Sequence, residues 1–302
     1  MEGTTDRPDL GSVVVGVDGS EPARRAALWA ADEAARRDTL LHIVHAADTD
    51  ARRLYLTADG VERVRGTGRE LLRETVGLVA ERFPGLRVST ELGRGAPAPS
   101  LRRAAGLRGT VVVGSRGLGG FAYLMLGSVG LRTVAGATTP VVVVRGADDT
   151  PVTGIVLVAV HDEHDAPCVR YAACEAEIRG ASLRLLHVWN VFGSVGVAAP
   201  MLDAVGTGVA ERVHRLNALA DRIRDEFPGL AVRTDTEKGL NAAGALVEAS
   251  HHADLLVMGG RRSPGYIGPT LGRVSHSLVH HAHCPVQLIP RRPAEQESAS
   301  DA

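Results

Sequence analysis

The chain carries the same sequence pattern twice. Residues 83–86, Phe-Pro-Gly-Leu, return at 227–230, and the valine-rich segment 139–144 has its counterpart at 284–289. Matching positions are separated by 142 to 145 residues throughout. Self-similarity at a nearly constant spacing marks a repeated structural unit. The sequence therefore predicts two homologous units in series.

The repeat predicts a first domain at 10–146 and a second at 152–291. The linker between them, residues 146–151, is short and polar and keeps the two copies close together. The tail 292–302 is rich in Pro, Glu, Ser and Ala. We expect this tail to be disordered, because it has too few apolar residues to join a core.

Each unit alternates short apolar segments with helical patterns. In the first unit, segments rich in β-branched residues predict five strands, near residues 12–17, 40–46, 86–92, 110–114 and 140–145. Residues 21–37 show helical periodicity, with an alanine-rich stripe on one side. Nearly continuous apolar strands separated by helices indicate a parallel sheet covered on both faces. The predicted fold class is α/β, with two tandem doubly wound five-stranded parallel sheets of strand order 3-2-1-4-5.

The composition argues against several classes of function. Lys and Arg total 34 against 35 for Asp and Glu, so no net field attracts nucleic acid or an anionic membrane. The N-terminal segment lacks the apolar stretch of a signal peptide, and no apolar run approaches the roughly 18 residues of a membrane span. Cys168, Cys174 and Cys284 form no disulfide framework. We expect a cytoplasmic protein without a nucleic-acid or membrane partner.

A glycine-rich loop follows the fourth predicted strand. Gly114, Gly117 and two further glycines let the backbone turn tightly and bring N–H groups close to an anion. Gly127 and Ser128 then open a helix, where unpaired N–H groups and the positive end of the dipole favour phosphate. In open α/β sheets, ligands bind where the strand order reverses, here between the first and fourth strands. The predicted occupant is a triphosphate bridged between the loop and the helix start.

Asp18, Gly19 and Ser20 follow the first strand and face the same crevice. Asp18 can accept a hydrogen bond from a base or a ribose, and Ser20 is the expected N-cap of the helix at 21–37. A glycine after a strand is common in turns. This loop therefore indicates a nucleotide site only in combination with the glycine-rich loop.

These features resemble the ATP-binding subgroup of the universal stress protein family. The fingerprint of that subgroup, Gly-x2-Gly-x9-Gly-Ser/Thr, is met by Gly114, Gly117, Gly127 and Ser128. The resemblance spans both units and nearly the whole chain. In the family, the fourth strand usually follows an Ala-Asp pair, and residues 105–109 depart from that pattern, which we expect to affect local capping more than binding.

The resemblance implies a flavodoxin-like fold of the adenine nucleotide alpha hydrolase-like type, paired through the fifth strands. It also implies that the protein binds ATP, with Mg²⁺ left open, rather than turning it over rapidly, and that it acts in stress tolerance or dormancy. Transferred by position, the resemblance implies that the ATP-binding residues are Val17, Asp18, Gly19, Ser20, Val44, His45, Gly114, Ser115, Arg116, Gly117, Gly127, Ser128 and Val129.

The second unit departs from the fingerprint. It keeps the spacing of 13 residues between its two anchoring glycines but replaces the other key positions. We expect this unit to be mainly a structural partner that binds no ATP, although arginines also pair with phosphates, so a different anion stays open. The degenerate second site comprises His161, Gly259, Arg261, Arg262, Gly272 and Arg273.

Two other classes of function compete with nucleotide binding. No Ser/His/Asp set or carboxylate pair accompanies the predicted site, so we expect no dedicated enzyme, and slow ATP hydrolysis is kept as an alternative. A nucleotide-independent scaffold is the other alternative. The histidine-rich segments 161–165 and 280–284 are read as loop and helix-end residues rather than metal ligands. Assembly is left open between an intrachain pair of domains and a homodimer.

Overall fold

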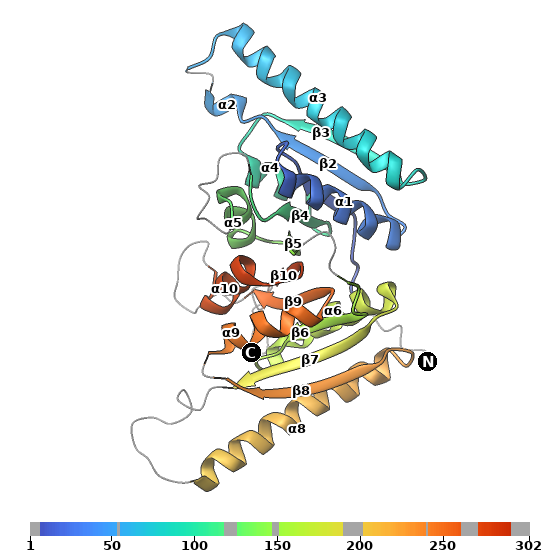
Figure 1. Cartoon of the computed structure of the whole chain (residues 1–302), viewed down its shortest axis with the longest axis vertical. Helices are drawn as coiled ribbons and strands as arrows, with labels where there is room; N and C mark the ends of the chain where they lie inside the picture. Colours follow the sequence, from blue (N-terminus) through green and yellow to red (C-terminus); the bar gives the residue numbers. More distant parts are fainter. Residues whose placement is uncertain are drawn as a thin grey trace, which may run out of the picture.

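The computed structural model describes residues 7–52, 55–117, 126–146, 151–189, 202–239, 241–260 and 271–290. These residues form one ten-stranded sheet with helices packed against it (Figure 1). No helix among them is long and apolar enough to cross a bilayer. The tail predicted at 292–302 lies outside the described residues.

In the first unit, the observed elements follow the predicted alternation of strand and helix. All five predicted strands are confirmed, each within two residues of its expected bounds. The elements are β1 (Val13–Gly16), α1 (Glu21–Arg36), β2 (Leu41–Ala46), α2 (Thr49–Arg52), α3 (Ala58–Arg82), β3 (Val88–Gly93), α4 (Pro97–Ala105), β4 (Thr110–Gly114), α5 (Ser128–Ala135) and β5 (Val141–Val144).

The second unit repeats this pattern. Its long helix α8 has 25 residues, the same length as α3. The elements are β6 (Ile155–Ala159), the 3₁₀ turn η1 (Glu163–Asp165), α6 (Ala166–Arg179), β7 (Ser182–Trp189), α8 (Leu202–Glu226), β8 (Val232–Lys238), α9 (Ala242–Ala249), η2 (Ser250–His252), β9 (Leu255–Gly260), α10 (Arg273–His281) and β10 (Val286–Pro290).

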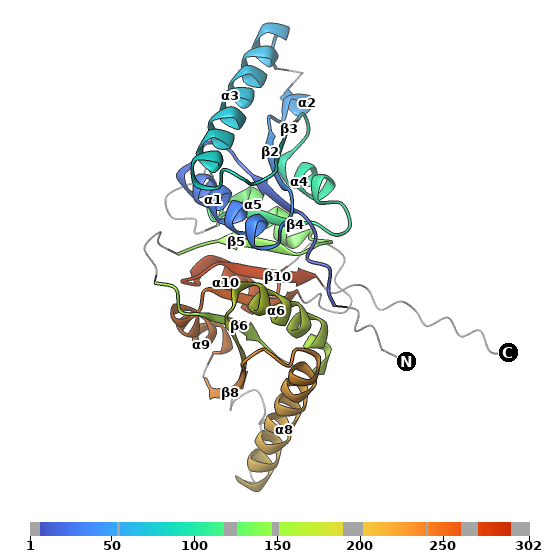
Figure 2. The same ribbon diagram turned by 90° about the vertical axis from the view of Figure 1, so that its right-hand side faces the viewer.

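The strand order is β3-β2-β1-β4-β5-β10-β9-β6-β7-β8. Each half therefore has the predicted order 3-2-1-4-5, with parallel neighbours. The two sheets expected from the sequence are joined into one, because β5 pairs with β10 in antiparallel register, Val142 opposite Gln287 (Figure 2). The two units are thus paired within the chain.

Helix α1 illustrates how the sequence sets the helix-to-sheet distance. Pro22 lies in its first turn, where a missing N–H costs nothing. Ala26, Ala30 and Ala34 are fully buried on the side facing the sheet. These methyl groups let the helix lie close to β1 and β4, as expected for an alanine-rich stripe of helical periodicity.

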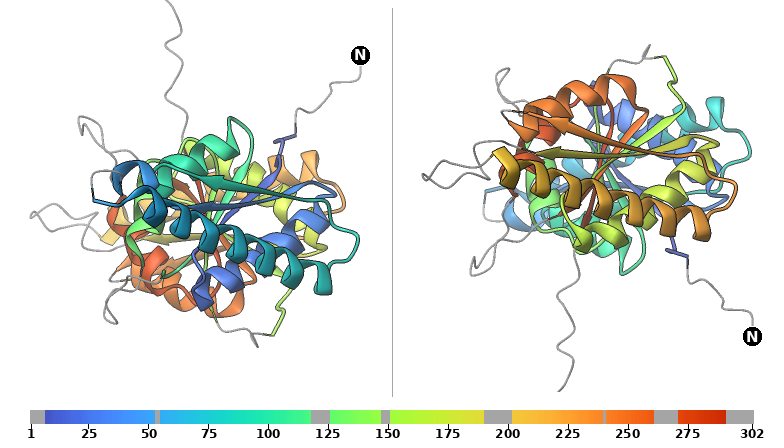
Figure 3. Two further views of the ribbon diagram at one scale, coloured as in Figure 1. Left: turned by 90° about the horizontal axis from the view of Figure 1, so that it is seen from above. Right: turned by 90° about the horizontal axis from the view of Figure 1, so that it is seen from below.

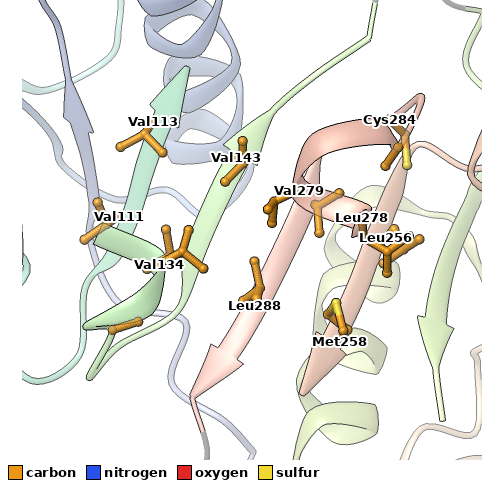
Figure 4. Close-up of a cluster of buried hydrophobic side chains, with 14 of the residues drawn as sticks. Val111, Val113, Val134, Val143, Leu256, Met258, Leu278, Val279, Cys284 and Leu288 are labelled. Carbon is orange, nitrogen blue, oxygen red and sulfur yellow. The ribbon is translucent and has the colours of Figure 1, made fainter. Parts of the chain in front are cut away.

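Helices cover both faces of the sheet (Figure 3). On one face, helices α4, α5, α9 and α10 cover a single apolar core that runs from the first unit into the second. Figure 4 shows its centre, with Val113 of β4, Val143 of β5 and Leu288 of β10 on three neighbouring strands. On the other face, α1 and α3 cover one core, and α6 and α8 cover another. At the junction of the two units, one face of the sheet therefore carries a continuous apolar core. On the other face the two units have separate cores.

Four charged side chains are buried where α1 meets α6, and we call them the charge quartet. Arg37, at the end of α1, donates to Glu33 (2.6 Å) and across the junction to Glu175 (2.7 Å). Arg179 donates to the same two glutamates. Each arginine thus bonds the glutamate of its own unit and that of the other. None of the four side chains is more than 7% exposed.

The two glutamates of the quartet are not equivalent. Burial, followed by repulsion from Glu175, raises the pKa of Glu33 above its ordinary value. Burial acts the same way on Glu175, but Arg179 and Arg37 offset it and lower the pKa to about 2. Glu175 also accepts a hydrogen bond from Gln287 of β10 (2.9 Å). Glu175 therefore stabilises the fold at neutral pH, and this contribution is lost as the pH falls from its ordinary pKa toward about 2.

Replacing Arg37 with Met is expected to lower the free energy of unfolding by about 3–5 kcal/mol, because it leaves Glu33 and Glu175 buried with one cation fewer. The measurement is urea unfolding of the full chain at neutral pH. The control is Arg36→Met, which removes an exposed ion pair with Asp32 (2.6 Å) and should cost less than about 1 kcal/mol. Equal effects of the two substitutions would contradict a structural role for the quartet.

Candidate functional site

A cavity of about 420 Å³ lies where the strand order reverses, at the carboxyl ends of β1 and β4 and beside the start of α5. Most of the residues predicted to bind ATP line it. Those lining it are Val17, Asp18, Val44, His45, Gly114, Arg116, Gly117, Gly127, Ser128 and Val129. The other three, Gly19, Ser20 and Ser115, belong to the loops that support it.

Asp18 and Gly117 lie against each other across the crevice. A Cβ atom at position 117 would lie 2.3 Å from Oδ2 of Asp18, so a side chain there would displace the carboxylate. The other carboxylate oxygen of Asp18 accepts the N–H of Ser20 (3.0 Å). Gly117 is thus required by the close approach of an acidic side chain, independently of any ligand.

Ser20 fastens the first loop to the second. Its hydroxyl accepts the N–H of Ala23 (3.3 Å), which confirms the predicted N-cap of α1. The same hydroxyl donates to the carbonyl of Arg116 (3.4 Å). Gly19 precedes it with φ +88°, a conformation that favours glycine. Ser20 therefore holds together the two loops that form the cavity, without lining it.

The loop between β4 and α5 is closed at its base. The N–H of Gly127 donates to the carbonyl of Ser115 (2.9 Å), so this amide is not available to a phosphate, contrary to the expectation for Gly127. Gly127 is the N-cap of α5, and no side chain caps the helix. The N–H groups at the first positions of α5, residues 128–130, are those that a helix start leaves for an external acceptor.

Gly114 has a packing reason to be glycine. A Cβ atom there would lie 2.6 Å from the backbone of Pro22 and 2.9 Å from the nitrogen of Ala23. The end of β4 can therefore touch the first turn of α1 only without a side chain. Its place in the fingerprint is explained by helix packing before any contact with a ligand is considered.

The opposite wall of the cavity comes from β2. Nδ1 of His45 lies 2.8 Å from the carbonyl of Val17, and the carbonyl of Val44 accepts the N–H of Val17 (3.0 Å). Several lining residues could not be predicted from the sequence, because isolated small or apolar residues carry no motif. They are Gly16, Ala23, Ala46, Pro97, Leu101, Val113 and Gly130. They make the inner part of the cavity apolar.

The charges of the cavity lie at its polar end. Asp18 and Arg116 are the carboxylate and the guanidinium among the residues that line it. Burial, and secondarily repulsion from Arg116, lower the pKa of Arg145, which donates to the carbonyls of Val279 (2.9 Å) and Ala282 (3.1 Å) in the second unit. An apolar slot beside a helix start and a guanidinium suits a planar ring that carries an anionic group.

No group of three or more His, Cys, Asp or Glu side chains among the described residues is placed to hold a metal ion. A Mg²⁺ ion bound through phosphates and water needs no such group. The histidine-rich segment 161–165 contains η1, and Asp162 and Asp165 accept backbone N–H groups in its capping box. These two carboxylates serve local structure.

A second, larger cavity of about 1000 Å³ occupies the equivalent place in the second unit. His161, Gly259, Gly272 and Arg273, all predicted for the degenerate site, line it. Arg261 and Arg262 lie outside the described residues. The second unit therefore retains a cavity, although the fingerprint residues around it have changed.

The fold and the first cavity define a doubly wound α/β protein with a crevice at its switch point, the place where ligands bind in open α/β sheets. A model of the universal stress protein family matches residues 10–145 and 153–290. The chain therefore belongs to the universal stress protein family.

Relatives and solved structures agree with this assignment. A universal stress protein of Mycolicibacterium smegmatis is 30% identical over 299 residues, covering 93% of this chain and 97% of its own. One from Mycobacterium tuberculosis is 31% identical over 288 residues, covering 91% and 95%. The crystal structure of a universal stress protein from Archaeoglobus fulgidus has a TM-score of 0.66 at 18% identity, covering 93% of this chain and 98% of that one. That similarity shows the shared fold.

Replacing Ser20 with Ala is expected to lower the free energy of unfolding by about 1 kcal/mol, because it removes the N-cap of α1 and the bond to Arg116. Urea unfolding of the full chain measures this. Ser128→Ala is the matched control, since Ser128 is exposed and no side chain caps α5. A loss of stability in the control equal to that of the Ser20 variant would contradict the assigned roles.

Proposed function

We propose that the first unit binds ATP and that nucleotide occupancy serves a regulatory role in stress or dormancy, in the cytoplasm. The observation that carries the proposal is the cavity at the β1–β4 switch point, where an apolar slot meets an uncapped helix start. The fingerprint residues Gly114, Gly117, Gly127 and Ser128 all lie around it. This combination favours a ligand with a flat apolar part and a polyanionic part.

The residues divide into two groups in this proposal. Asp18 and the wall from Val44 and His45 accommodate the adenosine part, beside the apolar slot. Arg116 and the N–H groups at residues 128–130 hold the phosphates, because a guanidinium and a helix start both stabilise negative charge. A Mg²⁺ ion, where present, is held mainly by phosphate and water oxygens.

We further propose that ATP is held rather than rapidly hydrolysed. Asp18 is the carboxylate lining the described cavity, and one of its oxygens accepts the N–H of Ser20. A second carboxylate for metal-assisted attack by water is not found among the described lining residues. Phosphate release by the purified protein measures this directly, and turnover faster than about 1 per second would contradict the proposal.

Gly117→Ala is expected to weaken ATP binding by about tenfold or more, because the methyl group displaces the carboxylate of Asp18 from the cavity. Isothermal calorimetry with ATP on the full chain gives the dissociation constant. Gly77→Ala on α3, where a Cβ atom meets nothing within 4 Å, is the control and should leave binding unchanged.

The alternative of a nucleotide-independent scaffold makes the opposite prediction. A wild-type protein that ignores millimolar ATP, and that releases no adenine nucleotide on denaturation, would overturn the proposed function. Equal affinities of the Gly117→Ala and Gly77→Ala variants for ATP would place the nucleotide elsewhere in the chain.

A further inference from the structure

The two long helices can be compared position by position. Helices α3 and α8 have equal length, and several of their buried positions coincide at a spacing of 144 residues, as for Val79 and Ile223. The neighbouring strands carry equivalent histidines. Nδ1 of His45 lies 2.8 Å from the carbonyl of Val17, and Nδ1 of His187 lies 2.9 Å from the carbonyl of Val160. The surroundings of the two histidines can therefore be compared directly.

One position decides how closely the long helix approaches the histidine. In the first unit, a Cβ atom on Gly68 would lie 2.7 Å from the ring of His45 and 2.7 Å from Leu92, so the helix fits there only with glycine. The equivalent residue in the second unit is Arg212. Its side chain excludes the same close contact between α8 and His187.

The second cavity extends beneath α8 as a result. Arg212, Leu216, Leu219 and Arg222 of α8 line it, whereas no α3 residue is among those lining the first cavity. The α8 residues contribute to the larger volume of the second cavity, about 1000 Å³ against about 420 Å³ for the first. The second cavity therefore differs from the first in its lining and volume as well as in its loop motif.

His187 lines this cavity and carries a buried ring nitrogen with an unsatisfied hydrogen-bonding capacity. The residue is 7% exposed, and its Nε2 atom has no hydrogen-bond partner within the part of the chain that the structure describes. Because the carbonyl of Val160 can only accept, the proton lies on Nδ1 and Nε2 carries a lone pair. Buried polar atoms are normally paired. His187 therefore requires a donor from outside the described chain, such as a ligand hydroxyl or N–H group.

The charged residues of the second cavity favour an anion. Arg212, Arg222 and Arg273 line it at positions where the first unit has Gly68, Leu78 and Ser128. Arg222 and Arg273 make no hydrogen bond or ion pair with any described residue.

The remaining charges of the second cavity are accounted for locally. Arg215 is paired with Glu211. Of the carboxylates that line the cavity, Asp165 accepts the backbone N–H of His161 and Asp162 accepts that of His164. Glu163 interacts electrostatically with Arg215. Helix α10, nine residues long, adds an N-terminus that no side chain caps.

We propose that the second cavity binds a multiply phosphorylated polyol or sugar, with its phosphates on the arginines and a hydroxyl donating to Nε2 of His187. The ligand differs from the nucleotide proposed for the first unit, because the second cavity is wider and more cationic. This site does not depend on ATP binding in the first unit.

The test is calorimetry of the full chain with fructose bisphosphate, compared with inorganic tripolyphosphate, which has no hydroxyl on carbon. We expect fructose bisphosphate to bind more tightly than tripolyphosphate, because it can donate a hydroxyl to His187. Arg212→Leu combined with Arg273→Ser should weaken its binding by about tenfold or more. Arg224→Leu, on the same helix but outside the cavity lining, should leave binding unchanged. His187→Phe should remove the preference for fructose bisphosphate over tripolyphosphate.

Three results would overturn the proposal. One is that fructose bisphosphate does not bind at millimolar concentration. Another is that the Arg212 and Arg273 variant binds it as tightly as the Arg224 variant does. A third is loss of binding in Gly117→Arg, which would assign the ligand to the first cavity. If thermal melting shows that the double variant does not fold, Arg222→Leu repeats the test, because Arg222 is an exposed residue on the cavity wall.

Discussion

The antiparallel pairing of β5 with β10 is the contact on which the architecture depends. β5 consists of four buried valines and would otherwise end the first sheet as an apolar edge with unpaired N–H and carbonyl groups. Pairing with β10 satisfies that edge and merges the cores of α4, α5, α9 and α10. The edge that the family resemblance assigns to pairing between domains is therefore used within one chain, and a second chain would have to bind another surface.

The duplicated units share a framework but differ where the long helix meets the sheet. Both keep the histidine at the end of the second strand and the same hydrogen bond to the first strand. With Gly68 the helix closes on the histidine, whereas with Arg212 it leaves room beneath it. The first unit has the fingerprint residues, and the second unit has the larger cavity.

The sequence was sufficient for the strands, the strand order and the N-cap at Ser20, because each depends on local patterns of apolar and capping residues. It also brought most lining residues of the first cavity together through the family fingerprint. The sequence could not show whether glycine at 114 serves ligand binding or helix packing, since the contact with Pro22 comes from a helix distant in the sequence. The charge quartet was equally hidden. Glu33 and Arg37, one helical turn apart, have the spacing of an ordinary exposed pair, and they are buried by contacts with distant parts of the chain such as α6 and Thr110.

The contribution of the charge quartet to folding stability does not alone explain why these residues are charged. A buried ion-pair network can often be replaced by apolar residues without loss of stability. All four residues of β5 are valine, so their side chains specify the register of β5 against β10 only weakly. The quartet supplies what they lack. Gln287 of β10 bonds Glu175, which bonds Arg37, and Arg37 bonds Thr110 at the start of β4 (2.9 Å). A slip of β5 along β10 would break this chain of bonds and leave buried charges unpaired, so the quartet fixes the alignment of the two units.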